Sequence, residues 1–241
     1  WVIYLNKHIV HKSMRQHLTA IGCMMVFWFF LRTIKYHIFQ DPLGGHICWY
    51  LYYVPMILIP TLGLTATLLL EERDEKRIKR ISAALLLPAV VLIVCVLTND
   101  LHQQVFSFPS GVLSDQAYRY ESGYFFVLAW EALCAGFALL SMVKNCRIPR
   151  SRRIRWLPLV PFALSLAYVY AYVQKIHWVW VLAGDMTVAQ CLIFASILEC
   201  CIQCGLIQSN LGYDELFEAT SLPVQITDQA FCSQYVSVAM R

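Results

Sequence analysis

The sequence predicts an all-α, polytopic membrane helical bundle that is followed by the start of an α/β domain. Apolar residues make up 59% of the 241 residues and charged residues only 14%, whereas charged residues are about a quarter of an ordinary soluble domain. The mean hydropathy is +0.57. The apolar residues also gather into six runs, each close to the roughly 20 residues that cross a bilayer as a helix. These observations favour a membrane protein with six visible spans.

The six predicted spans follow one another with short polar connections between them. They cover residues 18–39, 47–70, 81–98, 123–143, 156–173 and 186–207. The second span contains Pro55, Pro60 and Gly63, so we expect a kink in it. Residues 40–46 (QDPLGGH) are typical of a tight turn, and residues 71–80 (EERDEKRIKR) of a mixed-charge loop. The longest connection, residues 99–122, follows the third span.

The two ends of the chain predict further elements. Residues 1–17 indicate a basic loop, with the end of an earlier helix at residues 1–5. The chain begins with Trp1 rather than Met, so we expect a fragment cut at both ends. After the last span, residues 208–223 predict a linker helix that ends at Pro223. Residues 224–227 and 234–238 predict two strands of a hairpin.

Basic residues predict the orientation of the bundle. The connections on one side hold three, five and six Lys or Arg residues, and those on the other side hold none, one and one. Loops that are rich in Lys and Arg stay on the cytoplasmic side of a membrane. We therefore expect the N-terminus and the C-terminus to be cytoplasmic. Residues 40–46, 99–122 and 174–185 would then lie on the outer side.

Motifs for catalysis, metal binding and nucleic-acid binding are weak in this sequence. It contains no glycine-rich phosphate loop, no HExxH and no GxSxG, so nothing supports an enzyme within these residues. Cys200, Cys201 and Cys204 lack a histidine or a second CxxC beside them, which favours packing over a metal site. The basic residues 144–155 have the composition expected of a cytoplasmic membrane loop. We expect no cofactor, no metal and no nucleic-acid partner.

Two acidic residues fall inside predicted spans. A carboxylate at the centre of a bilayer is disfavoured by roughly 2.5 kcal/mol or more, and such residues face the bundle interior or mark ion and proton paths. Glu131 lies near the middle of the fourth span, and Glu199 lies close to the end of the last one. The alternatives are a hydrogen bond from Glu131 to a neighbouring helix, and access of Glu199 to water at the interface.

The predicted outer side gathers histidines, acids and aromatic residues, which together are typical of a small-ligand site. The candidates for ligand binding are His46, Asn99, Asp100, His102, Phe106 and Asp185. Other polar and aromatic residues of the same side are His37, Asp115, Glu121, His177, Trp49, Tyr50, Tyr53, Tyr124 and Trp178. Two histidines with two acids would also suit a divalent cation. The remaining alternative is an ordinary hydrated rim.

Two stretches resemble a known family. They are Thr98-Asn99-Asp100-Leu101-His102 with Phe106 four residues later, and GLIQSNLGYDELF at residues 205–217. Both are similar to the seven-transmembrane sensor region at the N-terminus of bacterial sensor histidine kinases, over about residues 10–228. In that family a proline usually stands where this chain has Gln208, which implies a gentler bend. The family has seven helices, so the resemblance implies that the first one precedes Trp1.

This resemblance implies a function that composition alone does not. Residues 1–207 would be a transmembrane sensor, residues 208–223 a cytoplasmic linker helix, and residues 224–241 the start of a PAS-like domain. The implied function is signal sensing in a two-component system, in a bacterial cell membrane, with a homodimer formed through downstream domains. The stimulus would be a small ligand or a physical change at the outer side. Asn210, Tyr213 and Phe217 would couple the last span to the output domain.

Two other functions stay open. A small transporter or channel would use Glu131 together with the prolines inside the spans, Pro55, Pro60, Pro158 and Pro161. A membrane enzyme that acts on lipid would need histidines and acids clustered at one interface. The outer side offers those residue types without a recognisable spacing.

Overall fold

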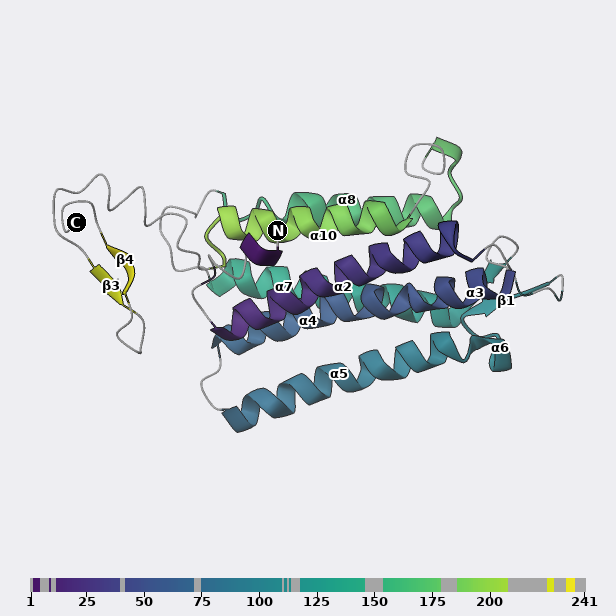
Figure 1. Cartoon of the computed structure of the whole chain (residues 1–241), viewed down its shortest axis with the longest axis horizontal. Helices are drawn as coiled ribbons and strands as arrows, with labels where there is room; N and C mark the ends of the chain where they lie inside the picture. The colour runs from purple at the N-terminus through teal and green to yellow at the C-terminus, as the bar shows by residue number, and fades with distance from the viewer. Residues whose placement is uncertain are drawn as a thin grey trace.

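The structure, a computed structural model, is a bundle of helices that run back and forth between two ends (Figure 1). It describes residues 2–4, 9, 12–39, 42–71, 75–109, 111, 113, 118–145, 154–178, 186–207, 225–227 and 233–236. The helices are α2 (Lys12–His37), α3 (Pro42–Leu51), α4 (Tyr53–Glu71), α5 (Glu75–Leu97), α6 (Asn99–His102), α7 (Ser122–Asn145), α8 (Leu159–Val173) and α10 (Met186–Gln203). We refer to the end that carries α6 as the α6 end, and to the end where α10 finishes as the exit end.

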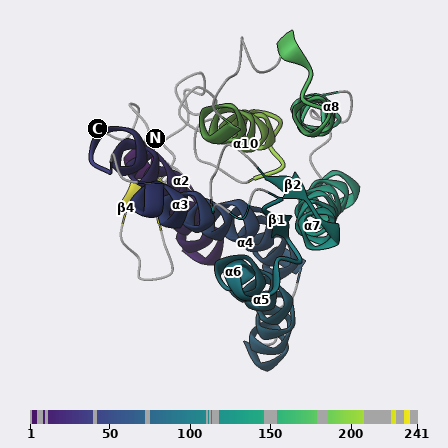
Figure 2. The same cartoon turned by 90° about the vertical axis from the view of Figure 1, so that its right-hand side faces the viewer.

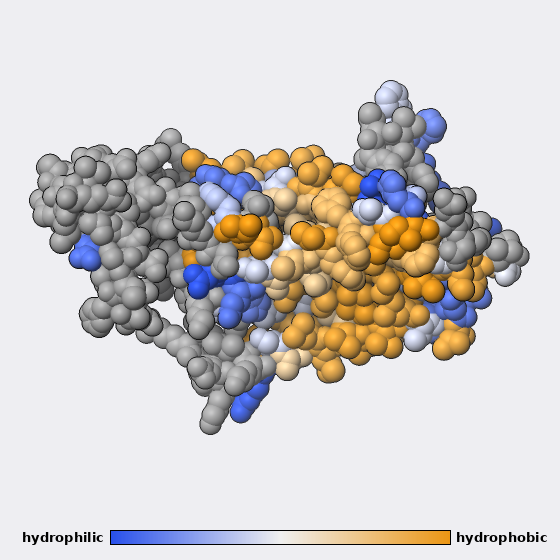
Figure 3. Space-filling model, in the orientation of Figure 1, coloured by the Kyte–Doolittle hydropathy of each residue, from blue (hydrophilic) through white to orange (hydrophobic). Residues whose placement is uncertain are grey.

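Five helical segments among the described residues are long and apolar enough to cross a membrane. They are Ser13–His37, Leu43–Leu68, Arg80–Leu97, Ser122–Lys144 and Met186–Gln203. Figure 3 shows the result on one face of the molecule, where hydrophobic residues form a wide band between the two ends and hydrophilic residues lie at its margins. This is the surface expected of a multi-pass membrane protein, because apolar side chains can face lipid without cost.

The fifth predicted span is shorter than expected. The helix α8 has 15 residues, which cover about 22 Å at 1.5 Å per residue, against the roughly 30 Å of a hydrocarbon core. Residues 154–158 form turns instead of helix. Proline lacks an N–H and is tolerated only in the first turn of a helix. Pro158 and Pro161 therefore set the start of α8 at Leu159.

The second predicted span is interrupted at a single residue, three residues before Pro55, one of the residues for which a kink was expected. The chain leaves helical geometry at Tyr52, between α3 and α4. Pro55 explains the position, because its ring would clash with the carbonyl of Leu51, four residues earlier. The expected turn at residues 40–46 was wrong for residues 42–46, which belong to α3, and residues 40 and 41 lie outside the described residues. Pro42 begins α3, a first helical position that proline favours because it has no N–H to leave unpaired.

Two predicted loops are partly helical. Residues 12–17 belong to α2 instead of a basic loop, and residues 75–80 belong to α5 instead of the mixed-charge loop. Lysine, arginine, glutamine and glutamate are good helix formers. They extend each helix beyond its apolar stretch, so hydropathy alone places the helix boundary too far inside.

The helix α4 lies at the centre of the bundle and packs against α2, α5 and α7 (Figure 2). Trp130 of α7 donates its indole N–H to the hydroxyl of Thr61 on α4, at 3.0 Å. By contrast α5 lies at the rim, where Leu87 is 69% exposed and Val91 is 54% exposed. The helix α8 packs against α10 and α7. Such an exposed apolar face on α5 is suited to lipid.

Two small antiparallel hairpins complete the described structure. At the α6 end, β1 (Phe106–Ser107) pairs with β2 (Arg119–Tyr120), a feature the sequence analysis did not predict. Near the C-terminus, β3 (Gln225–Thr227) pairs with β4 (Ser233–Val236). The second hairpin agrees with the predicted strands. Residues 208–223, the expected linker helix, lie outside the described residues.

Candidate functional site

The centre of the candidate site is Asn99, which is fully buried at the start of α6. Its side-chain oxygen accepts hydrogen bonds from the backbone N–H groups of Val105 and Phe106, at 2.9 and 3.0 Å. Its amide nitrogen donates to the carbonyl of Phe106 at 2.9 Å and to the hydroxyl of Tyr50 at 3.0 Å. One side chain thus fastens the β1 strand to α3. With its four bonds made inside the protein, Asn99 supports the site instead of facing a ligand.

Asp100, the next residue, collects two further bonds from α3. Tyr50 donates its hydroxyl to the carboxylate at 2.6 Å, and the ring nitrogen Nε2 of His46 lies 3.1 Å from the same oxygen. A carboxylate only accepts hydrogen bonds, so the proton of this contact lies on Nε2. His46 and Tyr50 are four residues apart and share one face of α3. The side chain of Asp100 is 39% exposed, whereas His46 is 2% exposed.

These contacts form one continuous chain of hydrogen bonds, which we call the α6 network. It runs from Asn99 through Tyr50 and Asp100 to His46. The second ring nitrogen of His46, Nδ1, is buried and has no partner among the described residues. Asp100 is the member of the network that solvent or a ligand reaches. A charge or ligand at Asp100 would therefore act on α3 and α6 together.

His102 lies close by in α6, but its hydrogen bonds go to the neighbouring backbone. Its Nδ1 accepts the backbone N–H of Gln104 at 3.0 Å, and its Nε2 donates to the carbonyl of Cys95 at 3.1 Å. Gln103, which lies between His102 and Gln104, has a left-handed backbone conformation with φ of 50°. His102 therefore caps the end of α5 and α6. The predicted ligand-binding role of His102 stays a prediction, and the geometry gives the ring a structural task.

Aromatic rings fill the space behind the network. Phe106 is fully buried, with ring centroids 4.6 Å from Trp49 and 5.7 Å from Tyr124. Tyr118 packs on Trp49 at 4.7 Å, and Tyr120 stacks on Tyr124 at 4.1 Å. Burial raises the pKa of the Tyr118 and Tyr120 phenols, which lie just before β2 and within it. Both stay protonated at neutral pH, so this wall of the site is uncharged.

The structure thus brings together four of the six predicted ligand-binding residues: His46, Asn99, Asp100 and Phe106. Asp185 and Asp115 lie outside the described residues. His37, His177 and Trp178 are exposed. The sequence analysis missed Tyr118 and Tyr120, although the alternation Tyr-Arg-Tyr at residues 118–120 is a strand signal that places both rings on one face. Tyr50 was expected only as an aromatic residue of the same side, and its role as a hydrogen-bond link between Asn99 and Asp100 was not predicted.

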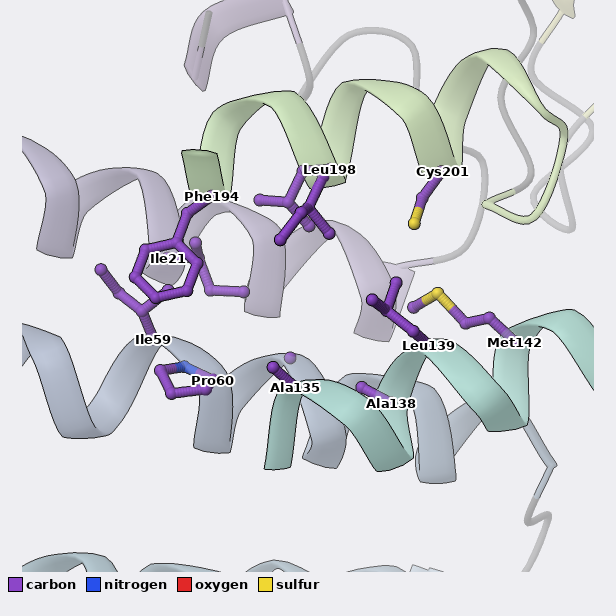
Figure 4. Close-up of a pocket in the computed structure, with 12 residues that line it drawn as sticks. Ile21, Ile59, Pro60, Ala135, Ala138, Leu139, Met142, Phe194, Leu198 and Cys201 are labelled. Carbon is purple, nitrogen blue, oxygen red and sulfur yellow. The ribbon is translucent and has the colours of Figure 1, made fainter. Parts of the chain in front are cut away.

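A small apolar cavity of about 60 Å³ lies deeper, among α2, α4, α7 and α10. Figure 4 shows Phe194, Leu198 and Cys201 of α10 pointing toward residues of the other three helices. Pro60 of α4 and Ala135 of α7 form part of the opposite wall. Because an empty cavity leaves its lining without contacts on one side, α10 is packed less tightly here than in a filled core.

The two intramembrane acids lie in different surroundings. Glu131 is 7% exposed on α7, and its Oε2 has no partner among the described residues. Glu199 on α10 is partly exposed and accepts a hydrogen bond from Gln203 at 2.8 Å. The access of Glu199 to water at the membrane interface stays a prediction. The hydrogen bond from Glu131 to a neighbouring helix is not seen for Oε2.

Among the described residues, no group of three or more His, Cys, Asp or Glu side chains could hold a metal ion. Asn210, Tyr213 and Phe217, the predicted coupling residues, lie outside the described residues. No family model matches the chain, and comparisons with curated proteins and with solved structures give no match either. The function is therefore inferred from the geometry of the α6 network and of α10.

Proposed function

We propose that this chain is a membrane-embedded signal sensor, in which a stimulus at the α6 end changes the position of α10 at the exit end. The observation that carries the proposal is the α6 network. A partly exposed carboxylate, Asp100, is bonded to two buried side chains of α3 and lies beside Asn99, which fastens β1. Ligand binding or a change of charge at Asp100 would break or strengthen bonds that hold three elements together.

The proposed mechanism is a population shift between two packings of the bundle. His46 and Tyr50 are on α3, which leads directly into the central helix α4. Both α4 and α10 line the small apolar cavity of about 60 Å³. Missing contacts there make the packing of α10 easier to change. A rearrangement at the α6 end would then favour one position of α10. Thr98, Asn99 and His102 belong to the outer elements of this mechanism, and Asn210, Tyr213 and Phe217 to the inner coupling.

The finer assignment is the sensor region of a bacterial sensor histidine kinase. Its support is the resemblance of residues 98–106 and 205–217, together with the basic loops that favour a cytoplasmic exit end. In this proposal the hairpin of β3 and β4 begins a PAS-like domain, and the protein is a homodimer through domains that follow.

A small transporter or channel is the second candidate. Glu131 favours it, because a buried carboxyl side chain without a partner for Oε2 is a common feature of ion and proton paths. The two functions differ in what α10 does. A sensor needs α10 to move with the α6 network, whereas a transporter needs a path that passes Glu131.

A chimera tests the sensor proposal. Residues 1–241 would be joined to the catalytic core of a histidine kinase that lacks its own sensor, and autophosphorylation would be measured in membranes. The Asp100→Ala variant should change basal autophosphorylation about threefold or more. A lost hydrogen bond of about 0.7 kcal/mol is enough for this, because 1.4 kcal/mol shifts an equilibrium tenfold. Leu101→Ala is the matched control, since Leu101 is 87% exposed in the same turn. Equal activity of Asp100→Ala and the unchanged chimera would contradict the sensor proposal.

A further inference from the structure

A second cavity, of about 210 Å³, lies between α7, α8 and α10. Its wall is apolar except for two side chains, Glu131 of α7 and Ser165 of α8. Both are buried, with 7% and 8% of their surface exposed. No basic side chain is among the described residues of its wall. The cavity therefore combines a large apolar body with one acidic and one hydroxyl group.

Glu131 is the unusual member of this wall. Its Oε2 atom is buried and has no hydrogen-bond partner among the described residues. A buried polar group without a partner is costly, and a charged one far more so. Such groups are rare in folded proteins and call for an explanation by a ligand, an ion or water. Glu131 belongs to the wall of the apolar cavity, so a ligand there would meet its carboxyl group and could supply a donor.

We propose that this cavity binds a small lipophilic amine, with its ammonium group on Glu131 and its apolar body between α7 and α8. A hydrogen bond between an ammonium group and a carboxylate is among the strong ones. The hydroxyl of Ser165 offers a second polar contact for the same head group. The rest of the wall rewards an apolar body by burying its surface.

The volume sets the size of the amine. An apolar cavity of about 150 Å³ accepts benzene. The 210 Å³ of this cavity therefore suits one aromatic ring with a short aminoalkyl chain. A molecule of the size of 2-phenylethylamine would fill it. A long-chain amphiphile would not fit as a whole.

The route of entry is from the bilayer. Leu166 of α8 is 44% exposed and Ala129 of α7 is also exposed, and both belong to the wall of the cavity. The mouth thus opens on the apolar surface of the bundle, where lipid would lie. Lipophilic amines partition into membranes and would reach Glu131 without crossing the α6 end. The site is separate from the α6 network and does not depend on the proposed sensor function.

The test is binding of 2-(4-fluorophenyl)ethylamine to the full chain in lipid nanodiscs, followed by ¹⁹F NMR. Empty nanodiscs give the contribution of the lipid. The chain should bind the probe saturably, with one site. Glu131→Gln should weaken binding by about 10-fold or more, because a hydrogen bond to a charged group contributes that much. Ala132→Leu, which fills the cavity from α7, should abolish binding and keep Glu131.

Two comparisons decide what is recognised. 4-Fluoroethylbenzene, which has the same apolar body without an amine, should bind at least about 10-fold more weakly than the amine. Circular dichroism melts of both variants show that they are folded, and Glu131→Gln should fold well because glutamine has nearly the same shape as glutamate and carries no charge in the apolar region. Absence of saturable binding to the unchanged chain would overturn the proposal. So would equal binding of the amine to Glu131→Gln, or equal binding of the two probes.

Discussion

Replacing Asn99 by alanine removes the side chain that joins β1 to α3. The structure predicts which groups then lose their partners. The backbone N–H groups of Val105 and Phe106 lose their acceptor, and the carbonyl of Phe106 and the hydroxyl of Tyr50 lose their donor. Asn99, Val105 and Phe106 are all buried, so these groups cannot simply turn to bulk water. We expect Asn99→Ala to release the segment from residue 104 to residue 109 before the bundle itself unfolds.

The size of the effect follows from the number of groups. A buried polar group left without a partner costs about 1–3 kcal/mol. A single water molecule has roughly the volume of the deleted amide and would restore some of the bonds. We therefore expect a loss of about 3–5 kcal/mol in the local opening free energy. Since each 1.4 kcal/mol is a factor of ten, amide exchange at Val105 and Phe106 should accelerate by about 100-fold or more.

Hydrogen–deuterium exchange of the chain in nanodiscs measures this release directly. Leu101→Ala is the matched control, because Leu101 is 87% exposed and lies two residues away in α6. Asn99→Asp keeps an oxygen to accept the two N–H bonds but replaces the donor by an acceptor, so it should fall between the wild type and Asn99→Ala. Unchanged protection of Val105 and Phe106 in Asn99→Ala would refute the role given to Asn99.

Three further predictions concern neighbouring contacts. In Gly123→Ala, the new Cβ would lie 2.8 Å from the backbone oxygen of Gln104, so the hairpin segment should shift and lose about 1–3 kcal/mol; unchanged amide exchange at Gln104 would contradict this contact. Trp130→Phe deletes the bond to Thr61 and should lower the free energy of unfolding in mixed micelles by about 0.5–1 kcal/mol. If Trp130→Phe costs the same in a Thr61→Val background, where the bond is already absent, the bond contributes nothing. Because burial raises the pKa of Tyr118, the phenol ionises first in the unfolded state, so stability should fall as pH rises above about 10; Tyr118→Phe should lessen this fall, and an identical pH dependence would count against the burial of Tyr118.

The helical bundle could be predicted because hydropathy acts over whole helices. Each long apolar run in the sequence became a helix, and errors appeared at the ends. Polar helix formers continued α2 and α5 beyond the apolar stretch, and Pro42 began a helix where Pro and Gly suggested a turn. Local composition does not distinguish a proline that begins a helix from one that forms a turn. That choice depends on what the next turn of the chain packs against.

The candidate site could be predicted as a list of residues, but not as a geometry. Three of its residues, His46, Asn99 and Asp100, were expected on one side of the membrane. They fall in two connections, residues 40–46 and 99–122, that the charge pattern assigns to the same side. The different roles of the neighbours Asn99 and Asp100 were not predictable. Asn99 is bonded to the backbone of Phe106 inside the protein, whereas the side chain of Asp100 is 39% exposed. Contacts between residues 46 and 100 depend on how α3 packs beside α5, and hydropathy holds no information on that arrangement.

If the α6 network sets the position of α10, loss of the Asp100 carboxylate should change where α10 lies at the exit end, and a distance measurement shows whether it does. Spin labels would be attached through non-canonical amino acids at Gln203 of α10 and Lys144 of α7, both exposed at the exit end. Distance distributions would be recorded by double electron–electron resonance in nanodiscs for the unchanged chain, Asp100→Ala and Leu101→Ala. We expect that Asp100→Ala alone redistributes the populations of the Gln203–Lys144 distance. Superimposable distributions for all three would contradict it.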